Sequence, residues 1–519
     1  IHGGSAMPDG NYMDSSAQGV VFKEKLKAAI ARINPKVSAD AQEDAFRKVL
    51  KTNSPNLIQN NYDFHRYLTE GVDVEFRVGD RIAGDKVWLI DYNNPENNEF
   101  FAVNQLEILE NNVIKIPDII IYINGLPLVV VELKNAADEN ANIKTAFTQL
   151  QNYKKAIPSL FHYNCLLIAS DGWEAIYGSL TAPKQFFLSW KSADGNATAD
   201  PNTPQMETMV KGMLNKQTLP DLIRHFTVFH KNKDELTKIV ARYHQYYAVN
   251  KAVEKTCTAT SENGDQRAGV VWHTQGSGKS LSMVFYTGKL VLSLNNPTIV
   301  VLTDRNDLDD QLFDTFSMSQ DLLRQTPVQA GSRDDLKKLL SVSSGGIVFT
   351  TIQKFLPEVV EKVALDNGKT KSIKGKYELL SDRRNIVVIA DEAHRSQYDF
   401  MDGFARHMRD ALPYASFIGF TGTPIEATDK NTQAVFGDYI DVYDIQQAVE
   451  DAATVRIFYE NRLAKINLKE EQKPQIDKEF EELTESEELT AQQNLKAKWA
   501  RLEAIVGDNN RLELIAKDI

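Results

Sequence analysis

The sequence predicts an α/β protein in which a mixed α/β domain precedes a domain built on a doubly wound parallel sheet. From residue 268 onward, an apolar strand, a polar turn and a helix recur in the same order, and the strands are apolar on both faces. Strands buried on both faces between helices are typical of parallel sheets. Upstream, helices and shorter strands follow one another without this repetition. A chain of 519 residues is too long for one core, so two or three domains are expected.

Hydrophobic spacing locates the elements of the first half of the chain. Helices are expected over residues 19–34, 38–51 and 143–156, the last of them ended by Pro158. Apolar, strand-like runs cover residues 71–78, 86–91, 100–108, 118–123, 128–133 and 165–170. Residues 191–205 are rich in Gly, Pro, Asn, Asp and Thr and predict a surface loop, and residues 218–254 predict helix.

Five apolar strands are expected in the second half, over residues 268–272, 298–302, 346–350, 386–390 and 416–420. Polar motifs follow directly after the carboxyl ends of these strands. Open α/β sheets bind ligands at that edge. The functional residues of the second domain are therefore expected there.

Composition and charge exclude several classes of protein. The net charge of −12 does not favour nucleic-acid binding, although a DNA groove needs only a local basic stripe. Two cysteines, Cys165 and Cys257, exclude a disulfide framework and a four-cysteine zinc site. No apolar stretch approaches the ~18–20 residues that span a bilayer, and the N-terminus lacks a signal peptide. A cytoplasmic protein without a membrane partner is expected.

A glycine-rich turn and a pair of carboxylates follow two of the predicted strands. Residues 275–280 read Gln-Gly-Ser-Gly-Lys-Ser, and residues 391–392 read Asp-Glu. Backbone N–H groups in such a turn cradle phosphates, a lysine reaches the β/γ-phosphates, and a hydroxyl and a carboxylate bind Mg²⁺. The sequence therefore predicts an ATP and Mg²⁺ site, with Glu392 orienting the attacking water and the ligand contacts made by Gly276, Ser277, Gly278, Lys279, Ser280 and Asp391.

The turn departs from the strict G-x-x-x-x-G-K-[ST] pattern, because position 273 is His rather than Gly. A plain strand-to-helix turn with an incidental lysine is the alternative. The adjacent carboxylates of Asp391 and Glu392 weigh against it, because they repel each other unless a cation such as Mg²⁺ lies between them.

Three more segments follow strands of the same sheet: Val-Leu-Thr-Asp-Arg at 301–305, Thr-Thr-Ile-Gln at 350–353 and Phe-Thr-Gly-Thr-Pro at 420–424. Together with Asp-Glu-Ala-His at 391–394 they resemble superfamily 2 helicases and translocases of the DEAH-box kind. The resemblance implies that these segments line a nucleic-acid groove and that the Thr-Gly-Thr-Pro turn couples it to the ATP site. It also implies that a second lobe, expected beyond Ile519, completes the ATP site.

The segment Arg-Tyr-His-Gln-Tyr at 242–246 resembles the adenine-reading element of the same family. The resemblance makes Gln245 the adenine contact, since an amide can bond bidentately to the N6/N7 edge. A surface glutamine on a helix is the alternative.

A second chemistry is predicted upstream. Asp118 follows Pro117, and Glu132-Leu133-Lys134 comes after thirteen intervening residues, which resembles the PD-(D/E)xK nucleases. Two carboxylates hold Mg²⁺ against a scissile phosphate, while the lysine activates water or stabilises the charge that develops. A charged strand edge is the alternative. A strict two-residue Asn-Gly hairpin would place Asp118 opposite Val131, so the site requires a three-residue loop or a bulge near Pro127.

The next predicted helix supports the nuclease hypothesis. Gln149 and Tyr153 lie at i and i+4 on one helical face and match the Q-x-x-x-Y element of RecB-like nucleases. That resemblance implies a catalytic role for both residues. Glu43 on an earlier helix could add an acidic ligand, with a surface glutamate as the alternative.

A RecB-like nuclease followed by a DEAH motor resembles the restriction (R) subunit of type I restriction–modification enzymes. Further matching segments are residues 93–98, 103–105 and 443–451. The resemblance implies an ATP-dependent translocase of double-stranded DNA that cuts away from the recognition site, in a complex with methylation (M) and specificity (S) subunits. The alternatives are a single-chain restriction enzyme, or a DNA or RNA helicase with an inactive, nuclease-like binding domain.

These motifs suggest five segments. Residues 1–18 are expected to be a tag-like or disordered start, and residues 456–519 an acidic linker with the start of an incomplete second lobe. Between them we expect a PD-(D/E)xK domain at 19–190, a linker with connecting helices at 191–235 and a first RecA-like lobe at 236–455.

Overall fold

The computed structural model describes residues 13–14, 19–78, 81–135, 142–232, 235–303, 306–355, 359–364, 370–374, 379–393, 404–423 and 435–456. Residues 1–454 form one compact unit. In the ranges above, no helix is long and apolar enough to cross a membrane. The expected acidic linker and second lobe lie outside the described residues, apart from Arg456.

The N-terminal part contains a five-stranded mixed sheet of order β10-β9-β8-β7-β4. Strands β8 and β9 are parallel, and the other neighbours are antiparallel. Nearly all of β8 is buried, because the sheet is covered on both faces where this Val-rich strand runs. The strands are β4 Phe100–Asn104, β7 Ile119–Ile123, β8 Leu126–Leu133, β9 Leu166–Ser170 and β10 Ala175–Gly178.

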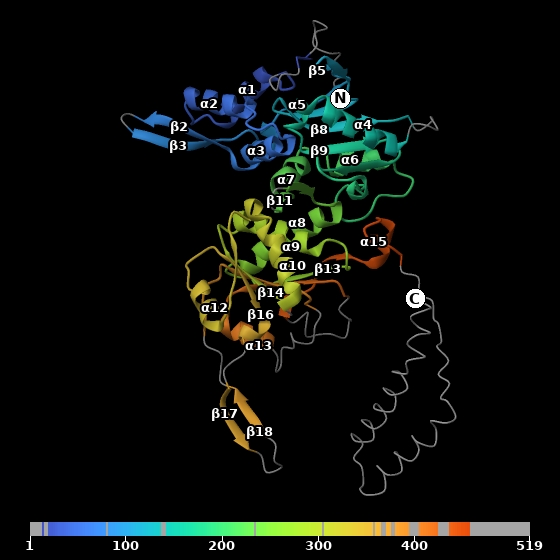
Figure 1. Cartoon of the computed structure of the whole chain (residues 1–519). Coiled ribbons are helices and arrows are strands. Elements are labelled where there is room, and N and C mark those ends of the chain that lie inside the picture. The colour runs from blue at the N-terminus through green and yellow to red at the C-terminus, as the bar shows by residue number, and fades with distance from the viewer. Residues whose placement is uncertain are drawn as a thin grey trace, which may run out of the picture. The chain divides into compact units, whose positions relative to one another are not determined.

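The predicted helices of this part are confirmed, and α4 has the predicted bounds (Figure 1). They are α1 Lys23–Ile33, α2 Ala39–Leu50 and α4 Ile143–Ala156, whereas α3 Leu57–Glu70 and α5 Pro158–Phe161 were not predicted. Short 3₁₀ turns occur at η1 Pro95–Asn97 and η2 Lys184–Phe186, and α6 Gln205–Gly212 follows.

Two predictions near the N-terminus are wrong in part. The strand expected over residues 86–91 ends early: β3 Arg81–Val87 pairs with β2 Val72–Val78 and stops before Trp88. The backbone N–H and C=O of Trp88 bond instead to the side chain of Asn34. Within the expected disordered start, β1 Met13–Asp14 pairs with β5 Ile108–Glu110, which pairs in turn with β6 Val113–Lys115.

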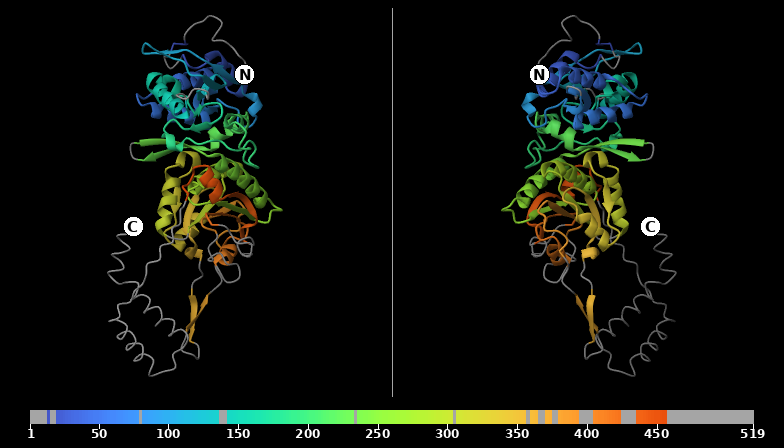
Figure 2. Two further views of the ribbon diagram at one scale, coloured as in Figure 1. Left: turned by 90° about the vertical axis from the view of Figure 1, so that its right-hand side faces the viewer. Right: turned by 90° about the vertical axis from the view of Figure 1, so that its left-hand side faces the viewer.

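The continuous helix expected over residues 218–254 is also wrong. Helix α7 Thr218–His225 is followed by a hairpin of β11 Thr227–Asn232 and β12 Glu235–Val240, and only then by α8 Tyr243–Thr260. β-Branched residues at both ends of the hairpin favour strands. The hairpin, green in Figure 2, contacts elements on both sides: buried Lys238 bonds to Asn164 O at 2.7 Å, and His230 Nε2 lies 3.1 Å from Ser319 Oγ.

The large sheet is parallel throughout, as predicted, with the order β15-β16-β14-β19-β20-β13-β21. Its five central strands are those expected from the sequence: β13 Arg267–His273, β14 Thr298–Thr303, β16 Ile347–Thr351, β19 Ile386–Ala390 and β20 Ser416–Thr421. The edge strands β15 Pro327–Gln329 and β21 Tyr439–Tyr443 were not predicted, because neither presents a continuous buried run.

Alternate residues of the central strands belong to two different hydrophobic cores, one on each face of the sheet. Val301 and Ile389 join the core that includes α8 and α9 Lys279–Ser293, whereas Val300 and Val388 join the core that includes α12 Arg333–Leu340 and α13 Phe404–Ala411. This is the two-residue period of a strand covered on both faces.

The remaining elements are α10 Asn306–Ser317, α11 Gln320–Leu323, η3 Ile352–Phe355, α15 Ile445–Glu450 and the hairpin of β17 Val359–Ala364 and β18 Thr370–Lys374.

Candidate nuclease and ATP sites

The register of β7 and β8 brings Asp118 opposite Glu132. Ile119 pairs with Val131, but Tyr122 pairs with Pro127, so the register shifts between Ile121 and Tyr122. One extra residue on β8, Leu128, accounts for the shift and forms a bulge beside Pro127. The predicted irregularity is therefore confirmed, and it takes the form of a bulge next to a two-residue Asn-Gly turn.

Asp118, Glu132 and Lys134 lie together at the end of these strands. Asp118 Oδ2 accepts a 2.7 Å hydrogen bond from the backbone N–H of Leu133. The Lys134 ammonium lies 2.5 Å from Glu132 Oε1. Lys134 N–H bonds to Ser170 O in β9, which fixes the strand end from the other side. The predicted common face of Glu132 and Lys134 is confirmed.

Glu132 is a buried carboxylate whose surroundings suit a cation. Its side chain is 3% exposed, and Oε2 is buried without a hydrogen-bond partner in the described ranges. Burial raises the pKa of Glu132, Asp118 adds to this through its charge, and Lys134 acts in the opposite direction. A divalent cation between Glu132 and Asp118 would satisfy the orphaned oxygen and lower the repulsion, so these residues fit Mg²⁺.

The following helix faces the same cluster. Tyr153 is buried and donates its hydroxyl to Ile116 O at 3.1 Å. Burial raises the pKa of Tyr153, a hydrogen bond with Gln149 opposes this, and the charges of Glu132 and Asp118 add to it. Tyr153 therefore lies beside both Glu132 and Gln149, whereas contact of Gln149 with the acidic pair stays a prediction. Their catalytic role stays a prediction.

Glu43 lies on α2 in surface ion pairs, 3.4 Å from Lys27 and 3.4 Å from Arg47. Across the described stretches there is no cluster of three or more His, Cys, Asp or Glu side chains suited to a metal ion. The two carboxylates Asp118 and Glu132 are therefore the acidic ligands that the structure brings together.

The glycine-rich turn has the backbone needed to wrap a phosphate. Gly276 and Gly278 have φ angles of 83° and 88°, in the left-handed region that favours glycine. Gly278 is the N-cap of α9, so the turn delivers the N-terminus of a 15-residue helix, with Lys279 and Ser280 in its first turn. Ser277 is buried, and its hydroxyl donates to Thr274 O at 2.6 Å. The hydroxyl therefore stabilises the conformation of the loop.

Asp391 and Glu392 lie at the same edge of the sheet. Asp391 N–H bonds to Leu302 O at the end of β14, and Ala393 N–H bonds to Phe420 O at the end of β20. Glu392 has a φ of 49°, a strained value for a residue with a side chain, and such values gather at functional sites. The predicted gathering of motifs at the carboxyl ends of the strands is confirmed.

Lys279 reaches the Thr421–Thr423 turn. A Cβ added to Gly422 would lie 2.8 Å from Lys279 Nζ. The lysine predicted to bind phosphate therefore contacts the turn predicted to couple ATP to nucleic acid. The remaining positions of these motifs, Asp304, Arg305, His394 and Pro424, lie outside the described residues.

The side chain of Gln245 is hydrogen-bonded to the backbone of the phosphate loop. It is 3% exposed, so the surface alternative is wrong. Its Oε1 accepts the backbone N–H of Arg242, and its Nε2 donates to Gly278 O at 3.0 Å. Contact with adenine stays a prediction.

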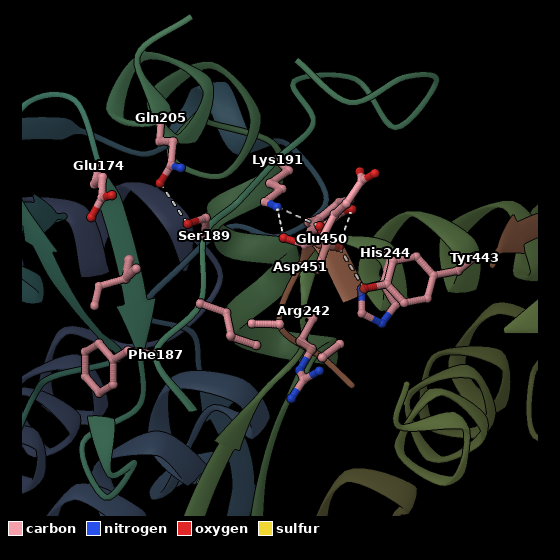
Figure 3. A pocket seen from close by; sticks show the side chains of 15 residues that line it. Glu174, Phe187, Ser189, Lys191, Gln205, Arg242, His244, Tyr443, Glu450 and Asp451 are labelled. Atoms are coloured by element: carbon pink, nitrogen blue, oxygen red, sulfur yellow. Dashed lines mark hydrogen bonds and ion pairs between the residues drawn. The ribbon is translucent and has the colours of Figure 1, made fainter. Parts of the chain in front are cut away.

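A second set of contacts that supports the phosphate loop was not predicted from the sequence, and Figure 3 shows its side chains His244, Tyr443, Asp451 and Lys191. The imidazole of His244 stacks on Tyr443 at 3.8 Å and lies 3.1 Å from Ser277 O in the phosphate loop. Asp451 accepts the Tyr443 hydroxyl at 2.7 Å and forms a 2.8 Å ion pair with Lys191. Burial lowers the pKa of His244 to about 3, which keeps the imidazole neutral. His244 adjoins Gln245 in the sequence, which was the available signal.

Comparisons with known proteins cover both parts of the chain. Residues 4–186 match the family model described as type I restriction enzyme R protein N terminus, and residues 244–494 match that of SWI2/SNF2 ATPases. The type I restriction enzyme HindI endonuclease subunit of Haemophilus influenzae is 45% identical over 526 residues, covering 98% of this chain and 48% of that protein.

A second curated protein matches along the whole chain. The MjaIXP endonuclease subunit homologue of Methanocaldococcus jannaschii is 34% identical over 545 residues, covering 100% of this chain and 49% of that protein. A solved structure, a nuclease-deletion mutant of the Type ISP enzyme LlaGI with a DNA substrate mimic, is 17% identical over 47% of this chain and 23% of that chain, with a TM-score of 0.28. The chain spans about half the length of the curated relatives it matches. With one family model on each half and this identity across nearly all its residues, the chain belongs to the family of type I restriction enzyme endonuclease (R) subunits.

Proposed function

We propose that the protein is the motor and nuclease subunit of a type I restriction enzyme, which translocates double-stranded DNA at the expense of ATP and cuts it away from the recognition site. The observation that carries the proposal is the pairing of two sites in one chain. Asp118, Glu132 and Lys134 converge on one sheet, and the phosphate loop and Asp391–Glu392 share the carboxyl edge of another.

In the nuclease site, Asp118 and Glu132 would hold Mg²⁺, which supplies positive charge to the scissile phosphate when bound. Lys134, already beside Glu132, is placed to stabilise negative charge or to favour deprotonation of the attacking water. Gln149 and Tyr153 would orient this group from α4.

In the ATP site, the backbone of Gly276, Ser277 and Gly278 would bind the phosphates together with Lys279. Ser280 and Asp391 would hold Mg²⁺, and Glu392 would orient water. Methylation and specificity subunits would supply target recognition, and the assembled enzyme would act in the cytoplasm.

Replacing Lys279 with Ala tests the motor assignment. We expect ATP-dependent translocation by the assembled enzyme to be abolished, because one charge-assisted phosphate contact is worth ~1.5–3 kcal/mol before its catalytic role. Displacement of a bound oligonucleotide from duplex DNA measures translocation. Unchanged displacement by the variant would refute the assignment.

The inactive-nuclease alternative makes the opposite prediction in a nicking assay. A Mg²⁺-dependent nick that disappears in Asp118→Asn supports the nuclease, whereas the same low level of nicking in both proteins supports a binding module.

A further inference from the structure

A cavity of about 400 Å³ lies between the segment that follows β3 and the helices α7 and α9. Tyr92 and Asn93 line it from the segment, Arg224 and His225 line it from α7, and α9 contributes residues near its C-terminus. None of the lining residues belongs to the proposed nuclease or ATP site. One molecule of liquid water occupies ~30 Å³, so the cavity is a separate space with room for a small organic ligand.

Arg224 brings to this cavity a positive charge that lacks a protein acceptor. Its guanidinium lies 4.6 Å from the centre of the Tyr92 ring and 5.3 Å from that of the Trp88 ring. Within the described ranges its Nε is buried without a hydrogen-bond partner, and the guanidinium has no carboxylate at ion-pair distance. A guanidinium has only donors, and burying one without an acceptor is costly. An anionic ligand would remove this cost.

Further positive charge surrounds the α7 side of the cavity. Burial lowers the pKa of His225 well below its ordinary value, and the charges of Lys289, Arg224 and Arg324 act in the same direction. The lining carboxylate of Asp221 is already paired with Lys289, through both oxygens at 2.6 and 2.8 Å. The charge of the arginines is therefore the surplus that a ligand would meet.

The rest of the lining suits an oxyanion with a small organic part. Asn93 and Gln217 carry amide donors, and Pro220 and Leu292 add apolar surface. A guanidinium matches the geometry of a phosphate, to which it donates two parallel hydrogen bonds. The cavity therefore fits phosphate or a small phosphate ester.

The groove that adjoins the cavity does not suit a nucleic-acid strand. It is lined by the carboxylates of Glu96 and Asp194, and its lysine, Lys216, is paired with Glu96 at 2.7 Å. A strand carries a negative charge on every nucleotide, so a backbone that left the cavity by this groove would pass carboxylates. A short, free anion avoids this repulsion.

We propose that this cavity binds a small phosphate-class oxyanion, either inorganic phosphate or a phosphate monoester, through the guanidinium of Arg224. The site is distinct from the phosphate loop, because α9 begins at the loop with Lys279 and meets the cavity from Lys289 onward. Residues 92–95 belong to the expected nuclease domain and α9 to the expected motor lobe. The bound anion therefore links the two parts of the chain, and it stabilises the fold in proportion to its concentration.

The test measures anion binding to the full chain carrying Lys279→Ala, which weakens the phosphate loop as a competing site. Isothermal titration with inorganic phosphate, and separately with ribose 5-phosphate, is run against chloride at equal ionic strength, and the tighter ligand identifies the source. Arg224→Gln should weaken binding of both at least about tenfold, since a charge-assisted contact is lost. Ser293→Glu, at an exposed lining position, should also weaken binding because it adds a negative charge.

The imidazole of His225 supplies a second readout that does not depend on how the variants fold. An anion in the cavity offsets the cations around His225, so phosphate should shift the ring nitrogen resonances of this histidine in the NMR spectrum. Phosphate bound only at the loop after β13 would leave them unchanged.

Lys216→Gln is the matched control, because Lys216 lines the adjoining groove and not the cavity. It should bind both ligands as the Lys279→Ala chain does. If Arg224→Gln and Ser293→Glu keep full affinity, or if neither ligand shifts the His225 resonances, the proposal is wrong. If a DNA duplex shifts them and the two small ligands do not, a strand occupies the cavity and the proposal is equally overturned. The nuclease and ATP assignments rest on other residues and are not affected by these outcomes.

Discussion

At the scale of single residues, His273 is held by a hydrogen bond to a carboxylate on the neighbouring strand. The position takes glycine in the strict phosphate-loop pattern, but here the imidazole is fully buried and its Nε2 lies 3.0 Å from Asp441 Oδ2. Lys251 pairs with the other oxygen of Asp441 at 3.0 Å. Burial acts to raise the pKa of Asp441, but His273 and Lys251 outweigh it and hold this pKa below its ordinary value. The histidine that departs from the pattern therefore stabilises the pairing of β13 with β21.

Restoring the pattern with His273→Gly should consequently weaken the protein. We expect a loss of about 3 kcal/mol in the free energy of unfolding, because the change leaves a cavity and removes the hydrogen-bond partner of Asp441 Oδ2, although Lys251 still pairs with Oδ1. ATP affinity should not improve. Urea unfolding and an ATP titration measure the two effects.

His273→Asn keeps a hydrogen-bond donor near Asp441 and should lose less stability than His273→Gly. If the glycine variant is as stable as the parent and binds ATP more tightly, the histidine weakens the phosphate loop and does not stabilise the fold.

At the scale of elements, the turn between β7 and β8 sets the nuclease register. Asn124 is fully buried with a φ of 53°. Its Nδ2 donates to Leu89 O and Asn98 Oδ1, and its Oδ1 accepts from Glu99 N–H. This network anchors the turn, and the bulge that follows on β8 places Glu132 opposite Asp118.

Asn124→Ala should destabilise the protein by at least about 3 kcal/mol, since several buried groups lose partners and alanine resists a left-handed conformation. Asn124→Gly is the matched control. It loses the same hydrogen bonds without the backbone strain and should be about 1 kcal/mol more stable than the alanine variant. Thermal unfolding resolves both differences, and an alanine variant as stable as the parent would contradict this account of the turn.

Periodicity predicted the central strands and α4 because burial alone determines them. Periodicity failed where a polar side chain ends a strand or where a strand lies at the edge of a sheet. The side chain of Asn34 ends β3, β11 and β12 lie in a region with helical spacing, and β21 is an exposed edge. In the sites, the motifs predicted Asp118, Glu132 and Lys279. The contacts made by Tyr443 and Asp451 could not be predicted, because they depend on residues about 200 positions apart.

At the scale of the whole molecule, the proposed nuclease and ATP sites lie on separate sheets of one compact unit. The hairpin β11–β12 and the ion pair between Lys191 and Asp451 connect the parts that carry them. The acidic pair of the nuclease site lies on β7 and β8, and the phosphate loop follows β13. We therefore expect cleavage and ATP hydrolysis to depend on different residues and to be lost separately.

Lys134→Ala in the assembled enzyme tests this claim most directly, with ATP hydrolysis, translocation and double-strand breakage measured on the same preparation. Loss of one electrostatic stabiliser lowers a rate by ~10²–10³, so breakage should fall by that factor while hydrolysis and translocation keep their parental rates. Lys279→Ala in parallel should lose hydrolysis and translocation. If ATP hydrolysis collapses in a folded Lys134→Ala enzyme, Lys134 belongs to a coupling interface, and the assignment of separate nuclease and motor sites is contradicted.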